Sequence, residues 1–261
     1  MYRFAVRLTL LASALALAPG AVASDSVAGT PAVDLIPRDA LFGNPERANV
    51  QISPDGRYLS WVAAVEGVLN VWVAPADNPG QARAVTQDKA RGIRNYFWSY
   101  QPDTLLYLRD SGGDEDYHLH AVDLVSGMSR DLTPFAKTTA QVVGLSSKHP
   151  GSLLVGMNDR DAQWHDLYRV DLASGQRSLL ERNEDKIAGY IADADFRVRY
   201  AQRSRTDGGA DVLRRNDNGQ WESIEDIPFE DGLTTGPGGL TSDGATLYFT
   251  DSRGRNTAGL Y

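Results

Sequence analysis

The feature that most constrains this chain is a nine-residue stretch that occurs twice. Leu119-His-Ala-Val-Asp-Leu-Val-Ser-Gly127 returns 48 residues later as Leu167-Tyr-Arg-Val-Asp-Leu-Ala-Ser-Gly175, with six of nine positions identical. Each copy alternates apolar and polar residues, as a half-buried strand does, and then stops at Ser-Gly, where glycine permits a turn. A strand and turn repeated at a period in the forties favour an all-β fold, a β-propeller of four-stranded blades.

A hairpin recurs at the same period. Its first copy is Ile52-Ser-Pro-Asp-Gly56, in which proline, aspartate and glycine each favour a tight turn. The apolar residue that opens the second strand of each copy is spaced at 48, 48, 44 and 49 residues, at Tyr58, Leu106, Leu154, Val198 and Leu247. The pattern predicts about four and a half blades.

The fifth blade lacks a complete set of strands. Its third strand begins at Leu260-Tyr261, which occupy the places of Leu167-Tyr168, and the sequence stops there. A propeller ring interrupted at this point is incomplete and has an unpaired strand edge, which natural propellers avoid. We therefore expect the sequence to be the front part of a longer protein.

The chain divides into three parts. Residues 1–23 contain Arg3 and Arg7, an apolar run and the small residues Ala21-Val-Ala23, the pattern of a secretory signal peptide cleaved after Ala23. An uncleaved anchor is the alternative, but the apolar run is short for a bilayer. Residues 24–48 form an irregular lead-in rich in Ala, Pro and Asp, and residues 49–261 form the propeller. We expect a secreted or periplasmic protein with no membrane segment after cleavage.

Composition excludes several classes of function. The net charge of −8 and the pI near 5.0 argue against nucleic-acid binding, and the absence of cysteine excludes disulfides and thiolate chemistry. The sequence contains no Gly-x-Ser-x-Gly nucleophile elbow and no phosphate-binding glycine loop. We therefore expect no catalytic residue in this chain and no cofactor.

The candidate substrate-binding residues are three consecutive acids, Asp114, Glu115 and Asp116. One interpretation is a solvated turn between two strands. The other is a carboxylate cluster that faces the channel or a domain interface and pairs with the α-amino group of a peptide.

Two nearby histidines raise the question of a metal site. His118 and His120 lie two apart on a predicted strand, so they share a face about 7 Å apart. The same places in the second copy of the repeat hold Asp166 and Tyr168. This variation indicates ordinary strand positions, and we expect no metal site.

Three segments resemble the start of secreted bacterial peptidases of the prolyl oligopeptidase family, which includes dipeptidyl-peptidase and acylaminoacyl-peptidase types. They are residues 36–45, the Ser-Pro-Asp-Gly hairpin and Gly67-Val-Leu-Asn-Val-Trp-Val73. Ser111-Gly-Gly-Asp-Glu-Asp-Tyr-His-Leu-His120 resembles the acidic linker and third strand of the second blade in that family.

The resemblance implies an N-terminal propeller that caps a C-terminal α/β-hydrolase domain of the same full-length protein. In the family, that domain carries a Ser-Asp-His triad that hydrolyses short peptides, and the propeller restricts access to it. By this resemblance the partners are the hydrolase domain and peptide substrates, and the present chain alone is expected to be inactive.

Two other readings stay open. A non-catalytic periplasmic propeller that binds proteins would share the Ser-Pro-Asp-Gly hairpin, and only the sequence beyond Tyr261 separates it from the peptidase. A propeller glycosidase would need carboxylates near the axis. The acidic residues here cluster in one linker and do not recur on first strands, which argues against the glycosidase.

Overall fold

The computed structural model describes residues 35–261. The predicted signal peptide and the first part of the lead-in, residues 24–34, lie outside these residues. The chain divides into two compact units, residues 1–43 and 44–261. The described part of the first unit contains one short helix, α1 (Arg38–Phe42), which follows Pro37 and buries none of its side chains. Among the described residues, no helix is long and apolar enough to span a membrane.

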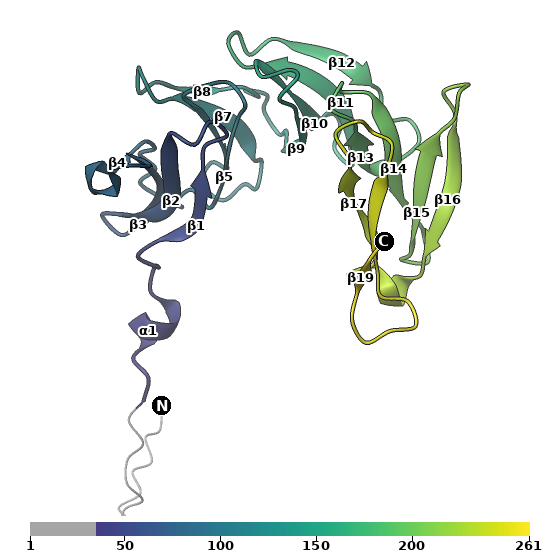
Figure 1. The fold of residues 1–261 in the computed structure, drawn as a ribbon, viewed down its shortest axis with the longest axis horizontal. Helices are drawn as coiled ribbons and strands as arrows, with labels where there is room; N and C mark the ends of the chain where they lie inside the picture. Colours follow the sequence, from purple (N-terminus) through teal and green to yellow (C-terminus); the bar gives the residue numbers. More distant parts are fainter. Residues whose placement is uncertain (1–34) are drawn as a thin grey trace, which may run out of the picture. The chain divides into compact units, whose positions relative to one another are not determined.

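The second unit consists of five antiparallel sheets, each made of consecutive strands (Figure 1). We call them blades 1 to 5. Blade 1 contains β1 (Ala48–Ile52), β2 (Tyr58–Val65), β3 (Val68–Pro75) and β4 (Arg83–Ala84). Blade 2 contains β5 (Asn95–Trp98), β6 (Thr104–Arg109), β7 (His118–Asp123) and β8 (Ser129–Asp131). Blade 3 contains β9 (Ala140–Leu145), β10 (Ser152–Asp161), β11 (Trp164–Asp171) and β12 (Arg177–Glu181).

Blade 4 contains β13 (Ile187–Ala192), β14 (Val198–Ser204), β15 (Ala210–Arg215) and β16 (Trp221–Ile227). Blade 5 has three strands, β17 (Gly236–Leu240), β18 (Leu247–Asp251) and β19 (Gly259–Leu260). Two 3-10 turns, η1 (Pro79–Gln81) and η2 (Phe229–Asp231), lie in connections. The predicted β-propeller of four-stranded blades, four of them complete, is confirmed, and within residues 44–261 no strand pairs blade 1 with blade 5.

The nine-residue repeat has the same role in blades 2 and 3. Leu119 and Val122 in β7, and their counterparts in β11, are fully buried. The aspartate that ends each strand, Asp123 or Asp171, accepts hydrogen bonds from the backbone and the hydroxyl of the serine three residues later. The glycine that closes each copy has a φ near +74°, which a residue with a Cβ adopts only with strain. The identical residues therefore specify one strand and its turn.

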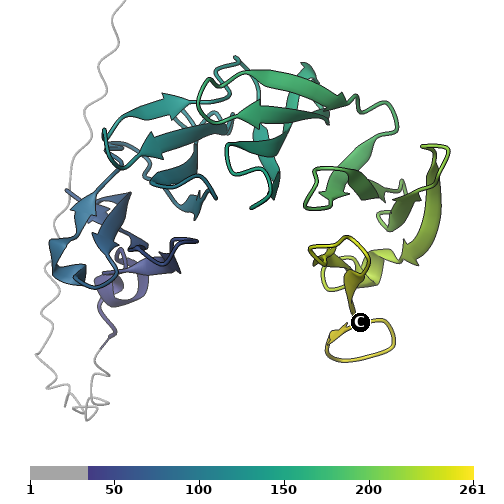
Figure 2. The ribbon, with the colours of Figure 1, turned by 45° about the horizontal axis from the view of Figure 1, so that its top comes forward.

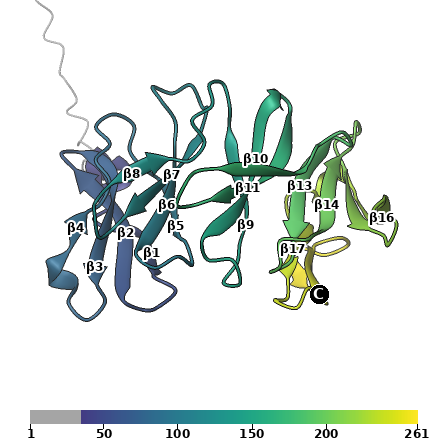
Figure 3. The same cartoon turned by 90° about the horizontal axis from the view of Figure 1, so that it is seen from above.

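Apolar clusters join each blade to the next. One contains Val71 of blade 1 and Trp98 of blade 2, and a second contains Leu119 of blade 2 and Leu153 of blade 3. A third joins blades 3 and 4, whereas between blades 4 and 5 the cluster contains only Ala210, Val212 and Ile227, with Phe249 packed against it. Figure 3 shows the sheets in succession. Sheet-to-sheet burial of alternate strand residues is thus the main source of stability.

The turns of each blade alternate between two rims because its strands run up and down. The first rim holds the turns between strands 1 and 2 and between strands 3 and 4. The second rim holds the connection between strands 2 and 3 and the connection to the next blade, as can be followed in Figure 2. Asn44 donates a hydrogen bond of 2.8 Å to the carbonyl of Gly67 on the second rim. The acidic linker also lies on this rim.

Candidate functional site

The acidic linker, residues 110–117, connects β6 to β7 in blade 2. Asp114 Oδ1 accepts hydrogen bonds from the backbone N–H groups of Ser111 (3.1 Å) and Asp116 (3.2 Å), so this carboxylate stabilises its own turn. Glu115 has a φ of +61°, and its carbonyl oxygen accepts a 3.2 Å bond from the Thr139 hydroxyl. The structure therefore gives the three predicted residues different environments.

Only two of the three predicted acids border a cavity. We call this cavity of about 530 Å³ the acidic cavity; its walls are formed by Arg109, Asp110, Ser111, Asp114, Asp116, His118, His120, Asp131, Ala136 and Lys137. Glu115 is not among them. The carboxylate of Asp116 makes no ion pair with any residue in the described range 35–261. Asp114 and Asp116 thus both face the cavity, and Asp114 already uses one oxygen in its own turn.

Two crossed ion pairs hold the linker against the connection from blade 1. Arg109 Nε lies 3.2 Å from Asp88 Oδ1, and Arg91 Nε lies 3.3 Å from Asp110 Oδ2. Both carboxylates are buried and both arginines are about half exposed. Burial raises the pKa of Asp88, but the backbone N–H groups of Gly92 and Ala90 outweigh it, so the pKa is lowered overall. Gly113 has a φ of +89°, which favours glycine, and a Cβ there would lie 2.8 Å from Arg91 Nη1.

Asp110 is a functional candidate that the sequence analysis missed. Its exposed fraction is 8%, and Oδ2 has no hydrogen-bond donor among residues 35–261. Arg91 supplies charge at 3.3 Å, but its N–H does not point at this oxygen. A buried carboxylate oxygen without a donor is energetically costly. In the sequence, the position of Asp110 immediately before Ser111-Gly-Gly113 could have indicated this candidate.

A second cavity lies on the other side of Arg109 and Asp110. We call this cavity of about 360 Å³ the arginine cavity; its walls are formed by Ala90, Arg91, Gly92, Arg94, Asn95, Leu108, Arg109, Asp110 and Tyr117. Arg94 forms no ion pair within the part of the chain that the structure describes. This cavity therefore has an unneutralised guanidinium in its wall.

The two histidines of β7 have different partners. His118 Nδ1 lies 2.7 Å from Asp131 Oδ2, whereas the His120 ring stacks on Tyr107 with ring centres 5.0 Å apart. Burial lowers the pKa of His120, which favours its neutral form. Over residues 35–261, no three His, Cys, Asp or Glu side chains are arranged to hold a metal ion.

The position of His118 has a structural role in the other blades. The equivalent Asn70 of blade 1 accepts a 2.8 Å bond from the backbone N–H of Asp88, and Asp166 of blade 3 accepts one of 2.8 Å from Asn183. In each case the side chain ties the third strand to the connection that leads to the next blade. In blade 2, His118 instead ties the third strand to Asp131, the last residue of β8.

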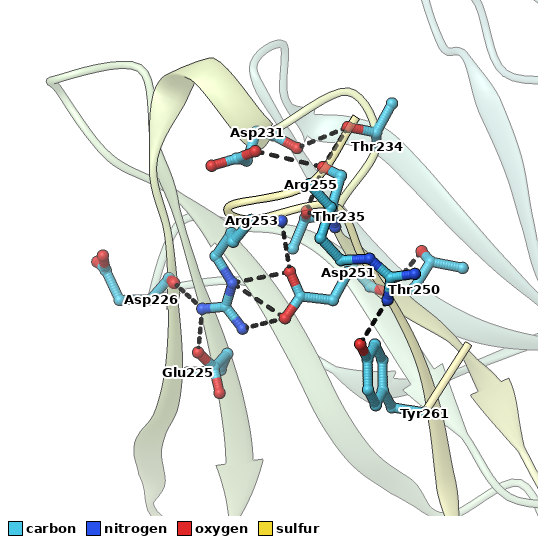
Figure 4. Close-up of polar contacts among 12 residues, drawn as sticks. Glu225, Asp226, Asp231, Thr234, Thr235, Thr250, Asp251, Arg253, Arg255 and Tyr261 are labelled. Carbon is cyan, nitrogen blue, oxygen red and sulfur yellow. Dashed lines mark hydrogen bonds and ion pairs between the residues drawn. The ribbon is translucent and has the colours of Figure 1, made fainter. Parts of the chain in front are cut away.

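The loop between β18 and β19 contains two arginines that also bind within the chain (Figure 4). Arg253 donates to both carboxylate oxygens of Asp251, at 2.7 to 3.1 Å, and pairs with Glu225 of blade 4. Hydrogen bonds from Arg253 lower the pKa of Asp251 to about 2. Arg255 Nη1 donates a 2.7 Å bond to the Tyr261 hydroxyl. Arg253 therefore joins blades 4 and 5.

Comparisons with known proteins agree with this fold. No protein-family model matches the chain. The chain is 76% identical to dipeptidyl aminopeptidase BIII of Pseudoxanthomonas mexicana over 98% of its own length, and it spans 38% of that relative's length.

Two solved structures share the fold at low sequence identity. The β-propeller domain of the trilobed protease from Pyrococcus furiosus matches 83% of this chain and 65% of its own, at 16% identity and a TM-score of 0.54. TolB from Acinetobacter baumannii matches 84% of this chain and 51% of its own, at 16% identity and a TM-score of 0.52. These two likenesses concern the fold alone, whereas the alignment with the aminopeptidase covers nearly the whole chain. The chain belongs to the prolyl oligopeptidase family, in which it corresponds to the N-terminal propeller part.

Proposed function

We propose that this chain is the N-terminal propeller of a secreted serine peptidase and that it limits which peptides reach a C-terminal α/β-hydrolase domain of the same protein. The observation that carries the proposal is the 76% identity to dipeptidyl aminopeptidase BIII across 98% of the chain. Because the chain spans 38% of that relative, the relative has ample further length for a catalytic domain. There a serine would attack the peptide carbonyl, with a histidine as general base and an acidic residue orienting it.

The proposal includes the division of the chain predicted from the sequence. Residues 1–23 would be the signal peptide, cleaved after Ala23 on export, residues 24–48 the lead-in and residues 49–261 the propeller. The charged, apolar and small-residue regions of the first 23 residues support export to the periplasm or the medium.

The acidic cavity is the proposed contact for the peptide's free N-terminus. A peptide ammonium carries three N–H donors and favours carboxylate oxygens. Asp116 has no ion-pair partner among residues 35–261, and Asp114 adds a second carboxylate although one of its oxygens holds the turn. Glu115 lies outside the cavity wall and would act on the ligand only through the local charge.

The test uses the full-length protein that contains this chain. We expect it to release dipeptides from the free N-termini of short peptides, to leave a folded protein uncleaved, and to lose activity after treatment with a fluorophosphonate. Mass spectrometry of the exported protein should show an N-terminus at Ser24. Full-length protein that neither cleaves peptides nor reacts with the fluorophosphonate would rule out the peptidase and favour the protein-binding propeller.

A further inference from the structure

The connection from blade 4 to blade 5, residues 228–235, exposes two large apolar side chains on the second rim. We call this segment the η2 connection. Phe229 is 71% exposed and Leu233 is 100% exposed. No other connection on this rim exposes a large apolar side chain between residues 44 and 261. Single exposed leucines are common on protein surfaces, but two large apolar side chains on one short segment of a rim that otherwise lacks them need an explanation.

Hydrogen bonds hold the η2 connection in one conformation. The hydroxyl of Ser252, which is buried, lies 2.6 Å from the Thr234 hydroxyl and 3.0 Å from the Thr235 hydroxyl. It also lies 3.2 Å from Asp231 Oδ1, to which it donates. The backbone N–H groups of both threonines donate to the Asp231 carbonyl, and Figure 4 shows how these three residues lie. A segment that is already ordered loses less free energy on binding a partner than a mobile one.

Phe229 is fixed in the same way. A Cβ at Gly208, in the turn between β14 and β15, would lie 2.6 Å from Cδ2 of the Phe229 ring, so the ring packs directly on this glycine. The φ of Gly208 is +86°, which also favours glycine. The turn lies on the second rim, so the ring is supported by blade 4 while most of its surface stays exposed.

The strand order indicates which partner this rim can reach. In each complete blade, the first strand starts on the second rim and the fourth strand ends there. A domain that follows the last four-stranded blade of a propeller is therefore joined to it on the second rim. The chain spans 38% of the length of dipeptidyl aminopeptidase BIII, so that relative has a large further part that such a rim could contact.

We infer that the η2 connection contacts the C-terminal part of the same full-length protein, through an apolar surface that receives Phe229 and Leu233. That this part is a hydrolase domain rests on the proposed function. Glu230, between the two apolar residues, is exposed and forms no ion pair within residues 35–261. The contacted surface should therefore also present a lysine or an arginine, because complementary charges fix the orientation of two surfaces.

The experiment measures how fast a thiol on the η2 connection reacts in the full-length protein. The present chain has no cysteine, so Leu233→Cys introduces one reactive site, and mass spectrometry of the labelled peptide identifies it. The matched control is Val125→Cys, because Val125 is 82% exposed in the turn between β7 and β8 on the first rim. Each rate with N-ethylmaleimide is divided by the rate of the same variant unfolded in urea. We expect Leu233→Cys to react at least about tenfold more slowly than Val125→Cys, because a covered thiol reacts only when the contact opens.

A second pair of variants tests whether the contact is apolar. In protein that carries Phe229→Cys, adding Leu233→Asp should raise the labelling rate at position 229 by about fivefold, because a carboxylate is costly in an apolar contact. A new carboxylate beside a thiol would by itself slow the reaction, so a faster rate reports loss of the contact. Adding Val125→Asp instead should leave the rate unchanged.

Equal relative rates for Leu233→Cys and Val125→Cys would overturn the inference. Slow labelling of Leu233→Cys that becomes fast on about a hundredfold dilution would also overturn it, because a second copy would then be the partner. Failure of the inference is distinguishable from failure of the proposed function. A protein that hydrolyses peptides but labels rapidly at Leu233→Cys keeps the proposed function and lacks this contact. A protein without peptidase activity that labels slowly at every concentration has the contact with a C-terminal part of another function.

Discussion

Blades 2 and 3 share the nine-residue repeat in their third strands but differ in the connection that precedes it. In blade 3, β10 and β11 continue to a tight turn, and Asp161 still pairs with Trp164. In blade 2, β6 stops at Arg109 and β7 starts at His118, with the acidic linker between them. The third strands have similar sequences because each packs into an apolar core between blades. The connection before them differs because it lies on the rim.

The buried carboxylates of the two blades show what this freedom allows. Asp166 of blade 3 accepts two 2.7 Å bonds from Arg160 and a 2.8 Å bond from the backbone N–H of Asn183. Asp110 of blade 2 is similarly buried, yet its Oδ2 lacks any donor within residues 35–261. A fully bonded carboxylate stabilises the fold, whereas one with an oxygen that lacks a donor costs stability.

The largest expected effect is the loss of the Asp166 carboxylate. Asp166→Ala leaves the Arg160 charge and the buried N–H of Asn183 without their acceptor, and we expect it to destabilise the protein by about 3 kcal/mol. Urea unfolding of the full-length protein, followed by far-UV circular dichroism, would measure it.

The matched change in blade 2 is Asp110→Asn, which keeps the shape of the side chain. We expect a change of about 1 kcal/mol or less, because Oδ2 loses no hydrogen-bond donor and only the ion pair with the half-exposed Arg91 is weakened. Equal destabilisation by the two variants would break the distinction between a fully bonded carboxylate and one with an oxygen that lacks a donor.

The second effect concerns two neighbouring glycines with positive φ. Gly112→Ala and Gly113→Ala should each cost about 1 kcal/mol from backbone strain. A Cβ at Gly112 meets nothing within 4 Å, whereas one at Gly113 meets the Arg91 guanidinium. We therefore expect Gly113→Ala to lower the free energy of unfolding more than Gly112→Ala does, because only Gly113→Ala displaces the Arg91 guanidinium from Asp110. Equal destabilisation in urea unfolding would show that Arg91 moves aside without loss of stability.

The sequence predicted those features of blades 2 and 3 that depend on residues close together in the chain. The repeat at Leu119 and Leu167 specified strands, turns and the blade fold because its burial and turn bonds are made within a few residues or within one period. The pairing of Arg91 with Asp110 joins residues of different blades, which no local pattern encodes. For the same reason the sequence indicated Asp114, Glu115 and Asp116 as one cluster, whereas the structure places Asp114 and Asp116 in the wall of one cavity with Asp110 and leaves Glu115 outside it.

The third effect is on acid stability. The hydrogen bond from Arg160, followed by the backbone N–H of Asn183, lowers the pKa of Asp166 against the cost of burial. Its stabilising contribution is therefore complete above the unfolded pKa near 3.8 and is lost as the pH falls through the lower folded value. The melting temperature should fall less between pH 5 and pH 3 in Asp166→Ala than in the unmodified protein. Parallel pH profiles would contradict this assignment.

The smallest effect is expected at His118, which is either a structural residue of β7 or a contact for the peptide. Asn70 fills the equivalent place in blade 1 and ties the third strand to the next connection through its side-chain oxygen. If His118 is only such a tie, His118→Asn should change the free energy of unfolding by less than about 1 kcal/mol, because an amide N–H can replace the bond to Asp131. It should also leave peptide hydrolysis by the full-length protein unchanged, since the proposed contacts of the peptide ammonium are Asp116 and Asp114. A loss of hydrolysis with stability unchanged would instead place the imidazole in direct contact with the peptide, and the acidic cavity would then recognise its ligand through β7 as well as through the linker.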